Sequence, residues 1–201
     1  MDFRAPSILD RTDGILDRMK RASDKVEERL EKATAALAAS GVVYAIVGGN
    51  AVAAWVATVD ESAVRMTRDV DVMVRRAEFD QVREALEEAG FTYRHGAGID
   101  VFLDSPTSKA SDGVHIVFAG EMVRAHEPAP NPTLDETTTL GGVPYLPLLA
   151  LLQVKLTAFR RKDQVHVLDL IGVGLVDATW PDRLPAPLAA RLRELLDDPE
   201  G

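Results

Sequence analysis

The segment from residue 42 to residue 74 constrains the fold of this chain most strongly. It opens with an apolar run that has the length and β-branched content of a buried strand, and this run ends at Gly48-Gly49. The apolar residues at 51–57 then predict a short buried helix. A second strand is predicted at 69–74. If the two strands pair in one sheet, the glycine turn and the acids of the second strand meet at one sheet edge.

Two acids, Asp69 and Asp71, lie two positions apart on the second predicted strand. Because successive strand side chains alternate between faces, both point to one face with Cα atoms roughly 6.6 Å apart, while Val70 and Val72 point into the core. Two carboxylates about 4 Å apart repel each other by about 4 kcal/mol at an effective dielectric near 20, unless a cation lies between them. Mg²⁺ takes one or two carboxylates together with water and phosphate oxygens. The pair therefore predicts a metal ion that arrives with a nucleotide.

The Gly48-Gly49 pair predicts a second part of such a site. Glycines at a strand end let backbone N–H groups approach phosphate oxygens, and the N-terminus of the next helix, predicted near Asn50, adds partial positive charge. A tight turn that needs positive φ explains the same pair without any ligand. The pattern is not a P-loop, because Gly-Lys-Ser/Thr is missing, and not a dinucleotide fingerprint, because the third glycine is missing.

Composition limits the class of protein. The 201 residues are 46% hydrophobic, which suits one globular domain with its own core. The chain has no cysteine, which excludes disulfides and thiolate metal sites, and its 4 histidines lack zinc-ligand spacing. A net charge of -9 disfavours broad nonspecific binding of nucleic acid. The charged start and the lack of a long apolar run predict a cytoplasmic protein without membrane contact.

The rest of the chain predicts helices and short strands in alternation. The segment 126–144, rich in proline and threonine, predicts a surface connection without regular structure. The predicted fold class is α+β (mixed α/β), with a short mixed sheet flanked by helices and with helical extensions at both ends. Further helices are predicted at 16–40, 77–89, 147–161, 163–171 and 187–196, and further strands at 91–94, 99–103 and 114–118.

Two stretches resemble the signature of the DNA polymerase β-type nucleotidyltransferase superfamily: Gly48-Gly49-Asn50-Ala51-Val52 and Arg65-Met66-Thr67-Arg68-Asp69-Val70-Asp71. They are most similar to a bacterial branch related to the toxins of abortive-infection and type IV toxin–antitoxin systems. In that superfamily the glycine pair binds the triphosphate, and two acids on the next strand hold Mg²⁺ for attack on the α-phosphate. The resemblance implies Mg²⁺, or Mn²⁺ instead, as cofactor on Asp69 and Asp71, and nucleotide binding by Gly48, Gly49, Asn50, Thr67, Arg68 and Lys155.

The resemblance continues through residues 148–163. In the toxin-like branch a similar helix supplies a lysine toward the nucleotide phosphates, followed by a Lys-Asp pair, which here is Lys162-Asp163. Helical spacing independently places Lys155 on the apolar face of its helix. A lysine whose stem packs while its amine reaches water explains the same position. Asp163 fits either a helix N-cap or a site residue.

The sequence departs from the superfamily pattern at one place. Many active members carry a third acid on a neighbouring strand, where it acts as a base toward the incoming hydroxyl, and here His115 stands there. Histidine accepts a proton near neutral pH, so His115 joins Asp69, Asp71 and Lys155 as the predicted catalytic residues. Fallback candidates for the third acid are Asp100, Asp104 and Glu121.

The resemblance implies three parts: an N-terminal helical extension (1–32), a nucleotidyltransferase-like domain (33–172) and a C-terminal helical tail on the same domain (173–201). The implied activity is Mg²⁺-dependent transfer of a nucleoside monophosphate from an NTP to a hydroxyl of RNA, protein or a small molecule, in a toxin with a cognate antitoxin. The alternative is a catalytically degenerate module that binds a nucleotide or a protein. The apolar spacing of the first helix fits a homodimer contact or packing on the chain's own core.

Overall fold

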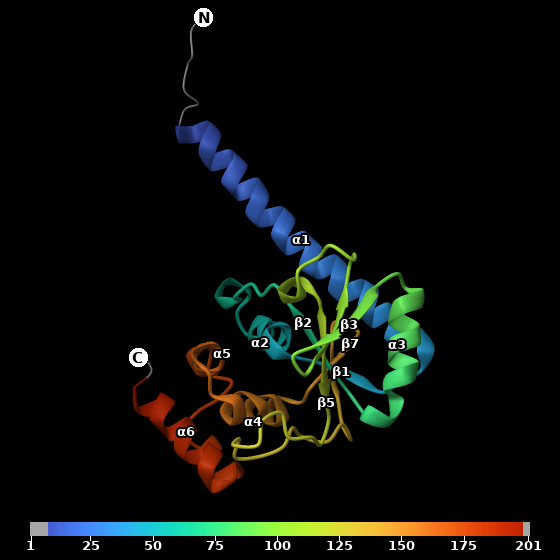
Figure 1. Ribbon diagram of the computed structural model, residues 1–201. Helices are drawn as coiled ribbons and strands as arrows, with labels where there is room; N and C mark the ends of the chain where they lie inside the picture. Colours follow the sequence, from blue (N-terminus) through green and yellow to red (C-terminus); the bar gives the residue numbers. More distant parts are fainter. Residues whose placement is uncertain (1–7, 199–201) are drawn as a thin grey trace, which may run out of the picture.

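The computed structural model describes residues 8–198, with side chains from residue 14 onward, so residues 1–7 of the predicted N-terminal extension lie outside the described part. A seven-stranded mixed sheet forms its centre, in the order β3-β4-β5-β2-β1-β7-β6 (Figure 1). This architecture confirms the predicted α+β class. The strands are β1 (Tyr44–Val47), β2 (Val70–Val74), β3 (Thr92–Gly96), β4 (Ile99–Leu103), β5 (Val114–Phe118), β6 (Thr138–Leu140) and β7 (Val143–Tyr145).

Helices cover both faces of the sheet. One face carries the end of α1 together with α3, and the other carries α2, α4 and α5, with α6 packed outside α4 (Figure 1). Within residues 8–198, no helix combines the length and the apolar character that crossing a membrane requires. The helices are α1 (Ile8–Ser40), α2 (Gly48–Ala57), α3 (Phe79–Glu88), α4 (Leu148–Ala158), α5 (Arg161–Gly172) and α6 (Ala186–Asp197).

The two halves of α1 have different surroundings. The first half runs out beyond the body of the molecule (Figure 1), and Leu16 and Met19 on it are 58% and 64% exposed. The second half buries Ala33 and Leu37 completely in the core. Packing of this helix against the chain's own core is therefore confirmed for its second half only.

Strand register brings the predicted site together. β1 and β2 are antiparallel, with Val47 opposite Asp71, and β5 runs parallel to β2 with His115 opposite Asp71. Val70 and Val72 are fully buried, as their alternation with the acids predicts. The strand begins at Val70, so Asp69 directly precedes it.

The turn after β1 is tighter than predicted. Helix α2 begins at Gly48, two residues before the predicted start at Asn50, so the strand passes into the helix without a loop. This is achieved by Gly48, whose φ of +70° lies in the left-handed region that favours glycine. The short connection holds the start of α2 at the end of β1.

The prediction that residues 126–144 lack regular structure is wrong at the C-terminal end of the segment. β6 and β7 form an antiparallel hairpin around Gly141 and Gly142, and β7 pairs in parallel with β1 through Tyr145. Both glycines have positive φ, of +56° and +84°, which is the conformation that a two-residue hairpin turn requires. The residues that predicted a break in structure therefore form the turn of a hairpin.

Candidate active site

Three side chains meet where β1, β2 and β5 lie side by side. One ligand atom from each of Asp69, Asp71 and His115 lies within 4.8 Å of the other two. Nδ1 of His115 is 3.8 Å from Oδ2 of Asp69 and 3.5 Å from Oδ1 of Asp71. The three side chains are 24%, 21% and 21% exposed, so the cluster is open to solvent on one side. The structure thus unites the predicted acid pair with the predicted histidine.

The position and charge of Asp69 are set by its neighbours. The hydroxyl of Thr67 donates to Oδ1 of Asp69 over 2.8 Å, and Nδ2 of Asn50 donates to the Asp69 carbonyl over 2.7 Å. Burial opposes ionisation of Asp69, but the Thr67 hydroxyl, a backbone amide, Lys162 and His115 together hold the pKa of Asp69 below its ordinary value. Asp69 is therefore a carboxylate at neutral pH, as a cation ligand must be.

The glycine turn packs directly against the second acid. A Cβ on Gly48 would overlap the carboxylate of Asp71 and lie 2.7 Å from its Cγ, and a Cβ on Gly49 would lie 2.9 Å from Oγ1 of Thr67. The first turn of α2 has neither a side-chain cap nor an acidic residue, so its N–H groups and the helix dipole favour an anion. A turn whose electrostatics suit an anion therefore lies directly beside the acid pair.

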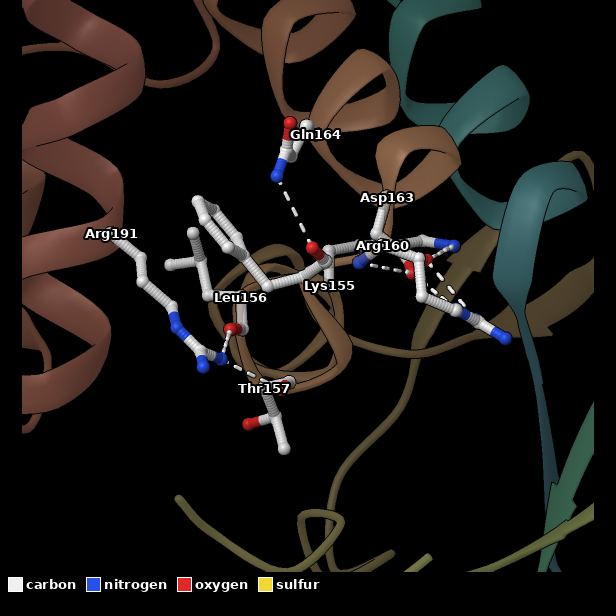
Figure 2. Close-up of polar contacts among 8 residues, drawn as sticks. Lys155, Leu156, Thr157, Arg160, Asp163, Gln164 and Arg191 are labelled. Atoms are coloured by element: carbon white, nitrogen blue, oxygen red, sulfur yellow. Dashed lines mark hydrogen bonds and ion pairs between the residues drawn. The ribbon is translucent and has the colours of Figure 1, made fainter. Parts of the chain in front are cut away.

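A buried ion pair joins α4 and α5 (Figure 2). Lys155 is only 3% exposed, and its Nζ lies 3.4 Å from Oδ1 of Asp163, which is 1% exposed. Burial lowers the pKa of Lys155, while the charges of Asp163 and Asp71 act in the opposite direction. Since the amine is buried, the interpretation of Lys155 as a lysine that reaches water is wrong.

Asp163 combines a structural role with a place near the site. Helix α5 begins at Arg161, so Asp163 is its third residue and not its N-cap. Oδ2 of Asp163 accepts a hydrogen bond from the backbone N–H of Arg160, the N-cap residue, over 3.2 Å. Nε of Arg160 also donates to Asp163, over 2.6 Å (Figure 2). The N-cap prediction is therefore wrong in position, although the side chain does satisfy the start of the helix.

Helix α6 braces the corner between α4 and α5. Nη1 of Arg191 donates to the carbonyls of Leu156 and Thr157 over 2.6 Å and 2.8 Å, and Gln164 donates to the Phe159 carbonyl over 3.2 Å (Figure 2). These contacts satisfy carbonyls at the end of α4 that have no partner within the helix. They fix the corner that holds Lys155 and Asp163.

None of the fallback acids belongs to the cluster of Asp69, Asp71 and His115. Asp100 accepts hydrogen bonds from the Tyr93 hydroxyl and pairs with His95, and Asp104 pairs with Arg29. Glu121 pairs with Arg76 over 2.6 Å. The expectation that one of these three acids replaces the third carboxylate is wrong.

One residue that supports the site was missed. Arg29 on α1 is 6% exposed, and its Nη1 donates over 3.0 Å to the carbonyl of Arg68, next to Asp69. Arg29 lies three residues after Val26 and four before Ala33, and this helical spacing places it on the apolar face of α1. The spacing alone could have indicated that Arg29 is buried. The side chain of Arg68 itself is exposed, so its predicted contact with a nucleotide stays a prediction.

The comparison with known proteins agrees with this geometry. A glycine turn at the end of one strand, packed on an acid pair at its antiparallel neighbour, is the layout that the resemblance to nucleotidyltransferases implies. The chain belongs to the family described as uncharacterised nucleotidyltransferase, whose sequence model matches residues 2–143. The match includes the glycine turn, the acids and His115, and it ends before Lys155. No curated protein sequence matches the chain.

Two solved structures share the fold at low sequence identity. The antibiotic-resistance factor ANT(2'')-Ia is 14% identical with a TM-score of 0.52, over 85% of this chain and 90% of that one. An antigenic nucleotidyltransferase-like protein from Paracoccidioides brasiliensis is 17% identical with a TM-score of 0.52, over 89% of this chain and 90% of that one. Likeness at this level of identity shows the fold, which is that of the nucleotidyltransferases.

Proposed function

We propose that this chain transfers a nucleoside monophosphate from an NTP to a hydroxyl of an acceptor, with a divalent cation held by Asp69 and Asp71. The observation that carries the proposal is the contact between Gly48 and the Asp71 carboxylate. Any side chain on Gly48 would displace the acid, so the turn and the acid pair are built as one unit. Such a unit suits the triphosphate of a nucleotide that binds together with its cation.

The residues present fit a divalent cation. Asp69 and Asp71 offer carboxylate oxygens close together and partly open to solvent, and the neighbours of Asp69 keep it ionised. The uncapped N–H groups at the start of α2 favour an anion, and phosphate oxygens are the remaining ligands that Mg²⁺ or Mn²⁺ prefers. When bound, the cation would neutralise phosphate charge and polarise the α-phosphate.

The chain's own groups would position the reactants. The N–H groups at the start of α2 would bind the triphosphate, and Lys155, whose charge interacts with that of Asp71, would offset negative charge that develops on the phosphates. In the reaction an acceptor oxygen forms a bond to the α-phosphorus, and the bond from that phosphorus to the bridging oxygen breaks. Pyrophosphate leaves, and the proton of the acceptor hydroxyl passes to a base in solution.

A label-transfer assay tests the proposal. The full chain is incubated with each α-³²P-labelled NTP and a divalent cation, with total RNA, total protein and small-molecule extract offered in turn as acceptor. We expect label on one acceptor class, and loss of that label in Asp69→Asn and Asp71→Asn. Asp24→Asn on the exposed part of α1 is the matched control. Label transfer that survives both site variants would contradict the proposal.

A second candidate is a module that binds a nucleotide without transferring it. The observation that favours it is His115, which stands where many members carry a third carboxylate. Under this alternative the wild type binds an NTP and Asp71→Asn does not, while no acceptor is ever labelled. Label transfer to any acceptor excludes it.

We also propose that the transferase acts as a toxin with a cognate antitoxin as partner. The support is the resemblance of the glycine turn, the acid pair and the Lys155 helix to the toxin-like branch. Expression of the wild type should arrest bacterial growth, and expression of Asp69→Asn should not. Unimpaired growth at equal protein levels would count against this role and would leave the transfer activity open to the label assay.

A further inference from the structure

The ring of His115 presents one nitrogen to the backbone and the other to the acid pair. Nε2 lies 2.7 Å from the carbonyl oxygen of Ala110. A carbonyl oxygen only accepts, so Nε2 carries the hydrogen and donates it. In the neutral ring the lone pair is then on Nδ1, the atom that lies 3.5 Å from Asp71 and 3.8 Å from Asp69.

The backbone fixes this orientation. His115 lies opposite Asp71 in the β2–β5 register, and Ala110 belongs to the 3-10 turn Ala110–Asp112 that leads into β5. Metal-binding histidines in proteins commonly donate their second N–H to a backbone carbonyl in this way, which fixes the tautomer and the ring plane. The side chain is 21% exposed, so the ring is held but not sealed from solvent.

We propose that Nδ1 of His115 is a direct metal ligand beside Asp69 and Asp71, so that the site prefers a first-row transition ion such as Mn²⁺ over Mg²⁺. The inference rests on the proposed function for the presence of a cation between the acids. Ligands at right angles around an ion at about 2.1 Å stand about 3.0 Å apart, so small side-chain movements close the observed separations. Mg²⁺ favours oxygen ligands strongly, whereas transition ions accept imidazole nitrogen.

The assignment changes the role expected of His115 from the sequence. With Nε2 donating to Ala110 and Nδ1 bound to a cation, the ring has no free nitrogen to take the proton of an acceptor hydroxyl. The competing explanation is that a protonated His115 neutralises the acids by itself and needs no metal. In that case Nδ1 never binds an ion, and the two explanations differ in what a metal spectrum shows.

The chain offers a matched control in His95. Its Nδ1 also meets a carboxylate, Oδ1 of Asp100 at 2.7 Å, but the ring is 58% exposed and the pair lies outside the cluster of three ligands. His95→Ala removes a histidine–carboxylate contact on the same sheet without removing a proposed ligand. It should leave metal binding unchanged.

Electron paramagnetic resonance of Mn²⁺ added to the full chain tests the proposal. It is measured first without nucleotide and then with a non-hydrolysable ATP analogue. The fall of the free Mn²⁺ signal gives the affinity of the chain for Mn²⁺, competition by Mg²⁺ gives the preference between the two ions, and electron spin echo modulation detects a nitrogen ligand on the bound Mn²⁺. We expect ¹⁴N coupling in the wild type and in His95→Ala and its loss in His115→Ala. We also expect Mn²⁺ to bind about tenfold or more tightly than Mg²⁺, and His115→Asp to reduce that ratio about tenfold.

The outcomes separate this inference from the proposed function. Bound Mn²⁺ without ¹⁴N coupling, or a preference that His115→Asp leaves unchanged, overturns the role of His115 and leaves the acid pair as the cation site. Absence of Mn²⁺ binding both with and without the analogue, or binding that Asp69→Asn does not weaken, overturns both. The nitrogen coupling is measured on the wild type, so the test stands even if a His115 variant fails to fold.

Discussion

Replacement of Gly48 by alanine perturbs the contact on which the proposed site depends. At φ +70° an L-residue costs about 1–2 kcal/mol relative to glycine. The new Cβ also overlaps the Asp71 carboxylate, and forcing that side chain off its rotamer costs about 0.5–1.5 kcal/mol more. Together these effects predict a loss of about 1.5–3.5 kcal/mol, or about 3–14 °C in Tm for a chain of this size.

Gly98→Ala separates the backbone cost from the contact with Asp71. Gly98 has a similar φ of +73°, lies exposed in the β3–β4 turn, and a Cβ there would meet nothing within 4 Å. We expect this variant to lose only the backbone part, about 1–2 kcal/mol. Thermal unfolding and calorimetric titration with NTPs are measured on both variants. NTP binding should be lost in Gly48→Ala and kept in Gly98→Ala; equal Tm losses with NTP binding kept in both would refute the reasoning.

Three further predictions concern groups around the site. Lys155→Met leaves the buried Asp163 carboxylate paired with Arg160 alone and should cost about 1–3 kcal/mol in urea unfolding, whereas Asp163→Leu, which leaves the buried Lys155 amine unpaired, should cost about 3–5 kcal/mol. Burial, reinforced by the charge of Lys155, lowers the pKa of His166 to about 4. Because the unfolded chain binds a proton at His166 below about pH 6.5 and the folded chain does not, this histidine should lower stability between pH 7 and pH 5. Over this range the wild type should lose about 1–2 kcal/mol more than His166→Gln does, after allowance for partial exposure. Asp104→Ala leaves the guanidinium of Arg29 largely unpaired and should cost about 1–3 kcal/mol, whereas an unchanged unfolding midpoint would show that the Arg68 carbonyl suffices.

The parts of the site that depend on local periodicity could be predicted from the sequence. Alternation along a strand places Asp69 and Asp71 on one side and Val70 and Val72 in the core, and the structure has this arrangement. The glycine pair after a buried strand likewise indicated the turn that packs on Asp71. To predict these features, one needs only the two-residue period of side chains along a strand and the conformational freedom of glycine.

Features that depend on contacts between distant segments could not be predicted in this way. Arg29 and Asp104 are 75 residues apart in the sequence, and no local pattern pairs them. The burial of Lys155 on Asp163 depends on the corner between α4 and α5, where Phe159 adopts a φ of +46° that its residue type does not favour. The division of the chain at residue 32 stays a prediction.

Calorimetric titration of the full chain with a non-hydrolysable NTP, in Mn²⁺ and again in EDTA, tests the central claim most directly. A cation shared between the acid pair and a triphosphate on the Gly48 turn predicts binding that requires Mn²⁺ and is lost in Asp71→Asn. Equal affinity in EDTA, or an Asp71→Asn variant that binds as the wild type does, would contradict it.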